Sequence, residues 1–199
     1  QHSLEIFSLV QTRSRDALIS INIDNGIAAM AIAQLAGASA EEIKRGMESF
    51  RGVDRRFDFH LRTKDKALIS DYAHHPAEIR QSALSIRELY KGKHITAVFQ
   101  PHLYSRTQDF YREFAESLSL FDEVILTDVY AAGEDLSEGA ESTAIIDHMT
   151  QSVQMVHREK LNNFLLDFVQ PGDMVLMMGA GNIWQNSMQL VEDLKHKQL

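Results

Sequence analysis

Two hydrophobic patterns alternate along most of this chain. Short apolar runs, typical of buried strands, are followed by longer stretches in which apolar residues recur every three or four positions, as in amphipathic helices. The runs that predict strands span residues 57–62, 67–73, 94–100, 123–128, 153–157 and 174–178. The stretches that predict helices span residues 76–90, 106–119, 142–150, 160–169 and 183–196.

Strands that alternate with helices predict βαβ units and a mostly parallel sheet. Residues 95–99, 124–126 and 175–178 are largely apolar, which suits strands covered on both sides. The runs at 57–62 and 67–73 flank a short polar turn and predict a hairpin. The predicted fold class is therefore α/β, a Rossmann-like mostly parallel sheet with helices on both faces.

The first part of the chain has a different pattern. Residues 4–10 and 17–23 predict short strands, and two helices follow, over 25–35 and over 40–50, the second with Ser39 as N-cap. So few elements bury too little surface to fold well alone. We therefore predict an incomplete domain over residues 1–53 and a full domain over residues 54–199. The first residue is Gln1, so we expect the chain to begin inside a longer protein.

Composition narrows the range of functions. The 199 residues have a formal net charge of −8, which disfavours nucleic acid as a partner. No cysteine is present, which excludes disulfides and thiolate metal sites. No apolar run approaches the ~20 residues that span a bilayer, and no signal peptide is visible, so we expect no membrane partner and a cytoplasmic location.

Polar residues cluster directly after four of the predicted strands. They form the segments 71–76 (DYAHHP), 100–107 (QPHLYSRT), 128–134 (DVYAAGE) and 179–182 (GAGN). Ligands collect at the carboxyl ends of parallel strands, so we predict one site along that edge. The chain contains no GxxxxGK[ST] loop and no GxSxG elbow, and it therefore lacks a P-loop of its own for ATP.

The histidines at this edge allow two interpretations. His74, His75 and His102, with Asp71, could form a metal site. Adjacent residues of a strand end point in opposite directions, however, so His74 and His75 are poorly placed to bind one ion together. The alternative is that one histidine caps the helix that begins at Pro76 or satisfies a buried carbonyl group, and this alternative suits His75 better than His74.

Arg106 and the glycine-containing loop are also open to two interpretations. At the start of a helix, Arg106 offers a planar fork to a carboxylate or phosphate, or an ion pair to Asp109 or Glu113. The loop from Gly179 to Asn182 resembles a dinucleotide loop only in part, and a tight backbone turn is the commoner reason for such glycines.

In order and spacing, these motifs, together with residues 52–57 (GVDRRF) and 178–183 (MGAGNI), resemble the Mur ligase family. The closest resemblance is to members that join L-alanine to UDP-N-acetylmuramate in peptidoglycan synthesis, and it covers nearly the whole chain from about Ile21. It implies that residues 1–53 end a central ATPase domain and that residues 54–199 admit the amino acid. The UDP-substrate domain, the P-loop and the Mg²⁺ ligands would lie outside this chain, which would be inactive alone.

The resemblance also implies a reaction and a set of residues. The muramate carboxylate would take the γ-phosphate of ATP, and the alanine amine would then attack the acyl phosphate. His74 and Arg106 would be catalytic, with His74 orienting the amino acid and Arg106 holding its carboxylate. The implied substrate-binding residues are His74, His102, Arg106, Gly179, Ala180, Gly181 and Asn182, and the implied ATP-binding residues are Asn22, Arg56, Asp71 and Tyr72.

Two other functions remain open from the sequence. A sister ligase could attach a different amino acid or a peptide to muramate, although the motifs at His102, Arg106 and Gly179 favour the alanine enzyme. A non-catalytic Rossmann-like binding module could use the same strand-end cleft.

Overall fold

The chain divides into two compact units, Gln1–Val53 and Asp54–Leu199. The structure is a computed structural model, and it describes residues 20–50, 53–63, 66–136, 140–170 and 172–196. In the described ranges, no helix is long and apolar enough to cross a membrane. Each unit is described by itself below.

In the described residues of the first unit, the helices are α2 (Ser20–Leu35) and α3 (Ala40–Ser49). Ser39 caps α3 in a capping box with Glu42, as the sequence predicted for the N-cap. The predicted strand at 4–10 lies outside the described residues. The predicted strand at 17–23 is wrong from residue 20 onward, because α2 already begins at Ser20. The isoleucines there alternate as in a strand, but extending an existing helix is easier than starting a new element.

The second unit is built on one six-stranded sheet in the order β1-β2-β6-β3-β4-β5. β1 pairs with β2 antiparallel, and all the other pairs are parallel. This arrangement confirms the predicted fold class and hairpin. The strands are β1 (Asp58–Arg62), β2 (Ala67–Asp71), β3 (Ile95–Phe99), β4 (Glu123–Leu126), β5 (Val153–Met155) and β6 (Met174–Met178).

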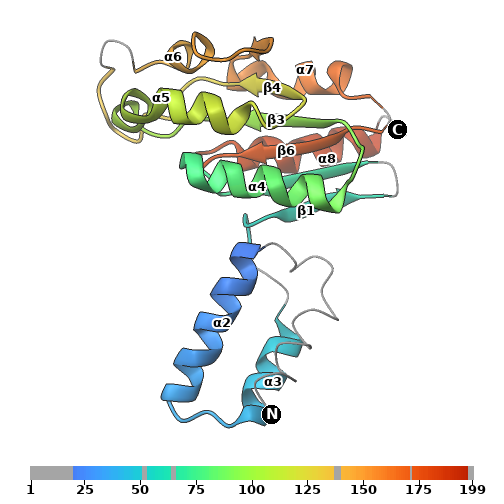
Figure 1. Ribbon diagram of the computed structural model, residues 1–199. Helices are drawn as coiled ribbons and strands as arrows, with labels where there is room; N and C mark the ends of the chain where they lie inside the picture. The colour runs from blue at the N-terminus through green and yellow to red at the C-terminus, as the bar shows by residue number, and fades with distance from the viewer. Residues whose placement is uncertain (1–19, 51–52, 64–65, 137–139, 171, 197–199) are drawn as a thin grey trace. The chain divides into compact units, whose positions relative to one another are not determined.

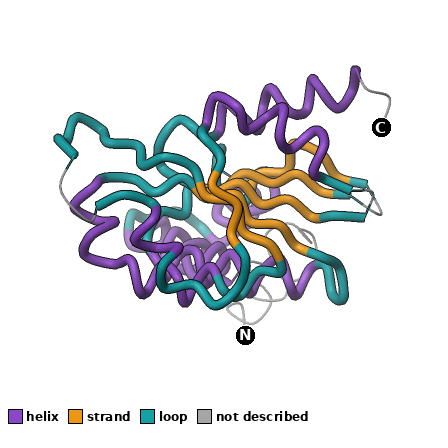
Figure 2. The backbone as a smooth tube through the Cα atoms, turned by 90° about the horizontal axis from the view of Figure 1, so that it is seen from above, coloured by secondary structure: helices purple, strands orange, loops and turns teal. Residues whose placement is uncertain are grey.

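Helices cover both faces of the sheet (Figures 1 and 2). On one face α5 contacts both α4 and α6, and on the other face α7 contacts α8. Helix α6 is much shorter than the predicted 142–150, and α5 begins two residues before the predicted start at residue 106. The helices are α4 (Pro76–Leu89), α5 (Tyr104–Leu118), α6 (Thr143–Ile146), α7 (Leu161–Phe168) and α8 (Trp184–His196), and a 3-10 turn, η1 (Arg158–Lys160), leads into α7.

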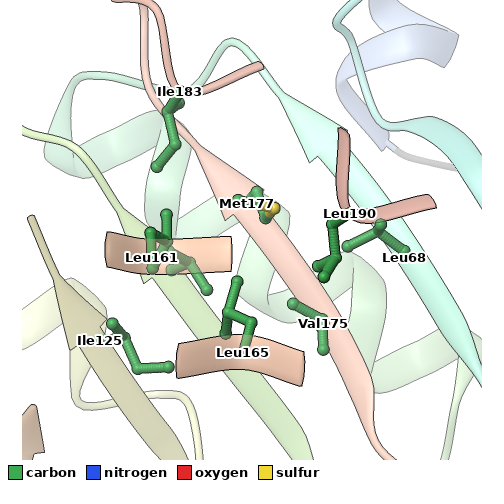
Figure 3. Packing of buried hydrophobic residues seen from close by; sticks show 9 residues of the cluster. Leu68, Ile125, Leu161, Leu165, Val175, Met177, Ile183 and Leu190 are labelled. Atoms are coloured by element: carbon green, nitrogen blue, oxygen red, sulfur yellow. The ribbon is translucent and has the colours of Figure 1, made fainter. Parts of the chain in front are cut away.

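The central strand β6 is buried along its whole length. On one side, Val175 and Met177 belong to a cluster with Leu161 and Leu165 of α7 and Leu190 of α8, and Figure 3 shows these side chains converging. Strands β3 and β6 are neighbours in the sheet. The helix after β3 is α5 and the helix after β6 is α8, and these two helices lie on opposite faces. Such a switch point opens a crevice at the carboxyl ends of the two strands, where α/β proteins bind ligands.

Candidate functional site

Aromatic rings from three strand ends form a row along the carboxyl edge of the sheet. The Tyr72 and His74 ring centroids are 5.1 Å apart, those of His74 and His102 are 6.1 Å apart, and those of His102 and Tyr130 are 5.5 Å apart with the rings stacked. These residues follow β2, β3 and β4. The structure therefore brings together His74 and His102, which the sequence placed on separate motifs.

His74 is held in one orientation by its Nδ1 atom. That atom lies 2.9 Å from the Tyr72 carbonyl oxygen and 3.2 Å from Oε2 of Glu78. A carbonyl oxygen can only accept a hydrogen bond, and the same holds for the ionised carboxylate of Glu78. The Nδ1 atom of His74 must therefore carry the proton. In the neutral ring, Nε2 is then the unprotonated nitrogen that accepts a proton or a hydrogen bond.

His75 caps a helix. Its Nδ1 accepts from the Ala77 N–H, and Glu78 bonds back to the His75 N–H in a capping box at the start of α4. This confirms the capping interpretation. In the described part of the chain, no group of three or more His, Asp or Glu side chains could hold a metal ion.

His102 and Arg106 each have a buried nitrogen without a partner. In the part of the chain that the structure describes, neither Nδ1 of His102 nor one terminal guanidinium nitrogen of Arg106 makes a hydrogen bond. Burial, together with the positive charge of Arg106 and the nearby His74, lowers the pKa of His102 below its ordinary 6.5. A neutral imidazole beside a fixed guanidinium, both with free hydrogen-bonding capacity, is suited to bind an anionic group.

The start of α5, which positions Arg106, is capped by a residue from another loop. Leu103 precedes the helix with φ of 71° and provides no side-chain cap. Instead, the Glu134 carboxylate accepts from Ser105 Oγ at 2.6 Å and from the Ser105 N–H at 3.0 Å. These bonds lower the pKa of Glu134, and they tie the loop that contains Tyr130 to the helix that contains Arg106.

The loop after β6 needs glycine because its backbone lies close to its neighbours. A Cβ atom on Gly181 would lie 2.6 Å from Oε1 of Gln100 and 2.7 Å from Cγ of Tyr130, and one on Gly179 would lie 2.9 Å from the Gln100 carbonyl oxygen. Gly179 also has φ of 152°. The tight-turn interpretation of these glycines is therefore confirmed.

Arg55 fills the space in front of this loop. One guanidinium nitrogen lies 3.1 to 3.4 Å from the carbonyl oxygens of Gly179, Ala180 and Gly181. The same guanidinium stacks on the Tyr72 ring, 4.8 Å from its centroid. Three converging carbonyl oxygens attract a cation, so in this conformation this side of the loop binds Arg55. Arg56, the predicted ATP-binding residue, is exposed.

The other predicted ATP-binding residues have different surroundings. The Asp71 carboxylate accepts from Ser82 Oγ and from the N–H groups of Tyr72 and Ala73, and burial raises its pKa above the ordinary 3.8. Its hydrogen bonds are thus made within the chain. Asn22 lies in α2, and its side chain is outside the described part of the structure.

A second polar region lies at the ends of β4 and β5. Its Asp128 belongs to the predicted segment 128–134, whereas His157 and Arg158 were not predicted as site residues. His157 Nδ1 is 2.6 Å from Oδ1 of Asp128, and the Arg158 N–H donates to the other carboxylate oxygen. These residues line an open pocket of about 360 Å³ together with Gln100, Val129, Tyr130, Ala131, Glu159 and Asn182. The signal was available, because His157 and Arg158 lie at the carboxyl end of the strand that the sequence predicted over residues 153–157.

Comparison with known proteins identifies the family. The domain described as "Mur ligase, glutamate ligase domain" matches residues 55–181. A UDP-N-acetylmuramate–L-alanine ligase from Phocaeicola vulgatus is 54% identical over 169 residues, covering 83% of this chain and 36% of that protein. The same ligase from Porphyromonas gingivalis strain W83 is 47% identical over 168 residues, with the same coverage.

Comparison with solved structures supports the same family. A UDP-N-acetylmuramate–alanine ligase from Thermotoga maritima superimposes with a TM-score of 0.71 at 28% identity, over 88% of this chain and 38% of that one. The chain belongs to the Mur ligase family. It spans a little over a third of the length of the ligases that it matches.

Proposed function

We propose that this chain is the C-terminal part of an ATP-dependent UDP-N-acetylmuramate–L-alanine ligase and that its carboxyl edge binds L-alanine. The observation that supports the proposal most strongly is the pair of buried, unpartnered nitrogens on His102 and Arg106, next to His74. The relatives with this activity share up to 54% of the aligned residues.

The geometry supports a role for each of the three residues in this proposal. The free guanidinium nitrogen of Arg106 and Nδ1 of His102 hold the alanine carboxylate by charge-assisted hydrogen bonds. His74 lies 6.1 Å from His102 between ring centroids, so its Nε2 is within reach of the amine of a small amino acid. Because Nδ1 of His74 is committed to Tyr72, Nε2 is the atom that accepts the amine proton.

The ATP-dependent steps need groups beyond this chain, since the sequence has no P-loop. We propose that Asn22, Arg56, Asp71 and Tyr72 contact ATP in the full-length ligase, and that the Mg²⁺ ligands lie in its central domain, whose end is formed by residues 1–53. Contact of Asp71 with ATP would require part of its present hydrogen bonding to Ser82 and the backbone to be given up. The cytoplasmic location also remains a prediction.

Steady-state kinetics of the full-length ligase test the proposal. His74→Ala should lower turnover, and Arg106→Ala should raise the KM for L-alanine while the KM for ATP stays unchanged. His75→Ala is the control, because His75 caps a helix. Unchanged L-alanine KM and turnover in both site variants would refute the assignment. A full-length protein that binds UDP-N-acetylmuramate but does not ligate L-alanine would refute the activity itself.

A further inference from the structure

Gln100 is a buried polar side chain with no role in the site described so far. It follows β3 at the switch point, and only 3% of its surface is exposed. Its side chain makes two hydrogen bonds to the loop after β6, although 82 and 83 positions separate the partners in sequence. A buried amide in such a position is costly unless its groups are satisfied in a defined arrangement.

The direction of each hydrogen bond follows from the chemistry of the partners. The Ile183 N–H can only donate, so the Gln100 atom that lies 3.1 Å from it must be the oxygen, Oε1. The other end of the amide is therefore the NH₂ group, which can only donate. Its neighbour at 3.1 Å must then be the oxygen of Asn182.

Hydrogen bonds thus run from the Ile183 N–H through Gln100 to Asn182, and this relay fixes the orientation of the Asn182 amide. Because Oδ1 of Asn182 faces Gln100, its NH₂ group is directed away from Gln100. No hydrogen bond of that NH₂ group is found among the described residues, and Asn182 borders the pocket beside Tyr130. The Ile183 backbone thus determines, through Gln100, that Asn182 offers a donor and not an acceptor to a ligand.

We propose that Gln100 is a positioning residue, which acts through Asn182 to present a hydrogen-bond donor to an anionic oxygen of a substrate. The inference rests on the proposed ligase function and extends it to a residue that does not itself touch the substrate. The relay also requires glycine at position 181. The Cβ atom of any other residue there would lie 2.6 Å from Oε1 of Gln100 and would push the Gln100 side chain out of place.

Two substitutions remove the donor in different ways. In Gln100→Glu, one carboxylate oxygen still accepts from Ile183, but the other faces Asn182 and makes its amide turn round, so that Oδ1 points toward the ligand. Asn182→Asp keeps the acceptor for Gln100 and loses the donor directly. Gln151→Glu is the matched control, because Gln151 also donates through its amide, to the Phe121 carbonyl, away from this loop.

The experiment measures KM for L-alanine and for ATP separately in the full-length ligase. Each of the two site variants should raise one KM roughly tenfold or more with little change in turnover, since a hydrogen bond to a charged group is lost. A higher KM for L-alanine identifies the anionic oxygen as one of the L-alanine carboxylate. A higher KM for ATP identifies it as a phosphoryl oxygen. A double variant that combines Asn182→Asp with Gln100→Met, and so adds no second carboxylate, should be no worse than Asn182→Asp alone, and Gln151→Glu should have wild-type KM values.

Wild-type KM values in Gln100→Glu, or single effects that multiply in the double variant, would overturn the inference. Urea unfolding shows whether each variant folds. If Gln100→Glu does not fold, Gln100→Met takes its place: without the relay Asn182 rotates freely and the same KM rises by a smaller factor, whereas an unchanged KM overturns the inference. Failure of the wild-type ligase to use L-alanine would instead refute the proposed function.

Discussion

The two edges of the parallel sheet differ in how their charged side chains are paired. At the amino edge, where β3 begins, Arg87 donates to Oδ1 of Asp122 at 2.9 Å, and Oδ2 of Asp122 accepts from the Ile95 N–H at 2.9 Å. At the carboxyl edge, His102 and Arg106 each retain a buried nitrogen that has no partner among the described residues. The charged groups of the first edge bond one another, whereas the second edge keeps hydrogen-bonding capacity that a ligand could use.

This difference separates structural from functional polar groups. A buried donor without a partner costs about 1–3 kcal/mol of stability, and such a cost persists where a ligand later supplies the missing acceptor. The hydroxyl groups of Tyr90 and Thr96 are also buried and unpartnered, but both are neutral. Among the described residues, the buried unpartnered atoms of charged side chains, Nε of Arg55 and one terminal nitrogen of Arg106, lie at the carboxyl edge. We therefore expect changes at the amino edge to affect stability and changes at the carboxyl edge to affect binding.

The largest effect should come from Gly181→Ala. The new methyl group would lie 2.6 Å from Oε1 of Gln100 and 2.8 Å from Cβ of Tyr130, so we expect a loss of about 3 kcal/mol in the free energy of unfolding. Gly92→Ala, in the turn before β3, is the control, because its φ is +74° but nothing lies within 4 Å, and we expect about 1 kcal/mol. Urea unfolding of the chain measures both. Equal losses would show that the carboxyl-edge packing is looser than described.

The next effect separates binding from stability. Arg106→Ala in the full-length ligase should raise the KM for L-alanine roughly 10- to 100-fold and leave the unfolding midpoint nearly unchanged, because one charge-assisted clamp is lost. Arg87→Ala should do the reverse, since Arg87 donates to the Leu120 carbonyl and to Asp122 and lies at the other edge. A higher KM in Arg87→Ala, with none in Arg106→Ala, would contradict the contrast between the edges.

A smaller effect should follow from Asp122→Ala, which leaves the buried Ile95 N–H without its acceptor. We expect a loss of about 1–2 kcal/mol. Although burial alone would raise it, the hydrogen bonds from Arg87 and Ile95 hold the pKa of Asp122 below its ordinary 3.8. The carboxylate therefore stabilises the fold above pH 3.8, and this stabilisation is lost as the pH falls through the lower folded-state pKa. Wild-type and variant stabilities should converge there, and urea titrations at several pH values test this.

The smallest effect concerns His102. Because burial, Arg106 and His74 lower its pKa, the neutral ring adds stability that is complete above pH 6.5 and diminishes as the pH falls through the folded-state pKa. An NMR titration should place His102 below 6.5, and Arg106→Ala should move it upward because a nearby positive charge is removed. Titration of His102 at or above 6.5 in the wild type would show that the ring is more hydrated than the structure indicates.

Much of the second unit could be predicted from the sequence because each element has its own local signal. Strand β6 was predicted with its observed bounds, and the capping role of His75 followed from its place before Pro76. The shortness of α6 and the helical start at Ser20 were missed, since hydrophobic period alone does not fix where a helix begins or ends.

Contacts that join distant segments could not be predicted in the same way. No local pattern shows that Gln100 reaches Asn182 or that Glu134 caps the helix that contains Arg106. The neighbours Arg55 and Arg56 are identical in chemistry, and only the backbone, with φ of 62° at Arg55, determines which of them faces the glycine loop. His157 and Arg158 were overlooked because the predicted strand ran on to residue 157, whereas β5 ends at Met155 and leaves both residues at its carboxyl end.

The most direct test of the account is a crystal structure of the full-length ligase with its product, UDP-N-acetylmuramoyl-L-alanine. We predict that the alanyl carboxylate lies within about 3 Å of the free guanidinium nitrogen of Arg106 and of Nδ1 of His102, with Arg87 and Asp122 unchanged. A carboxylate held by other groups, with the nitrogens of His102 and Arg106 still unpaired, would contradict the central claim that the open edge of the sheet is the amino-acid site.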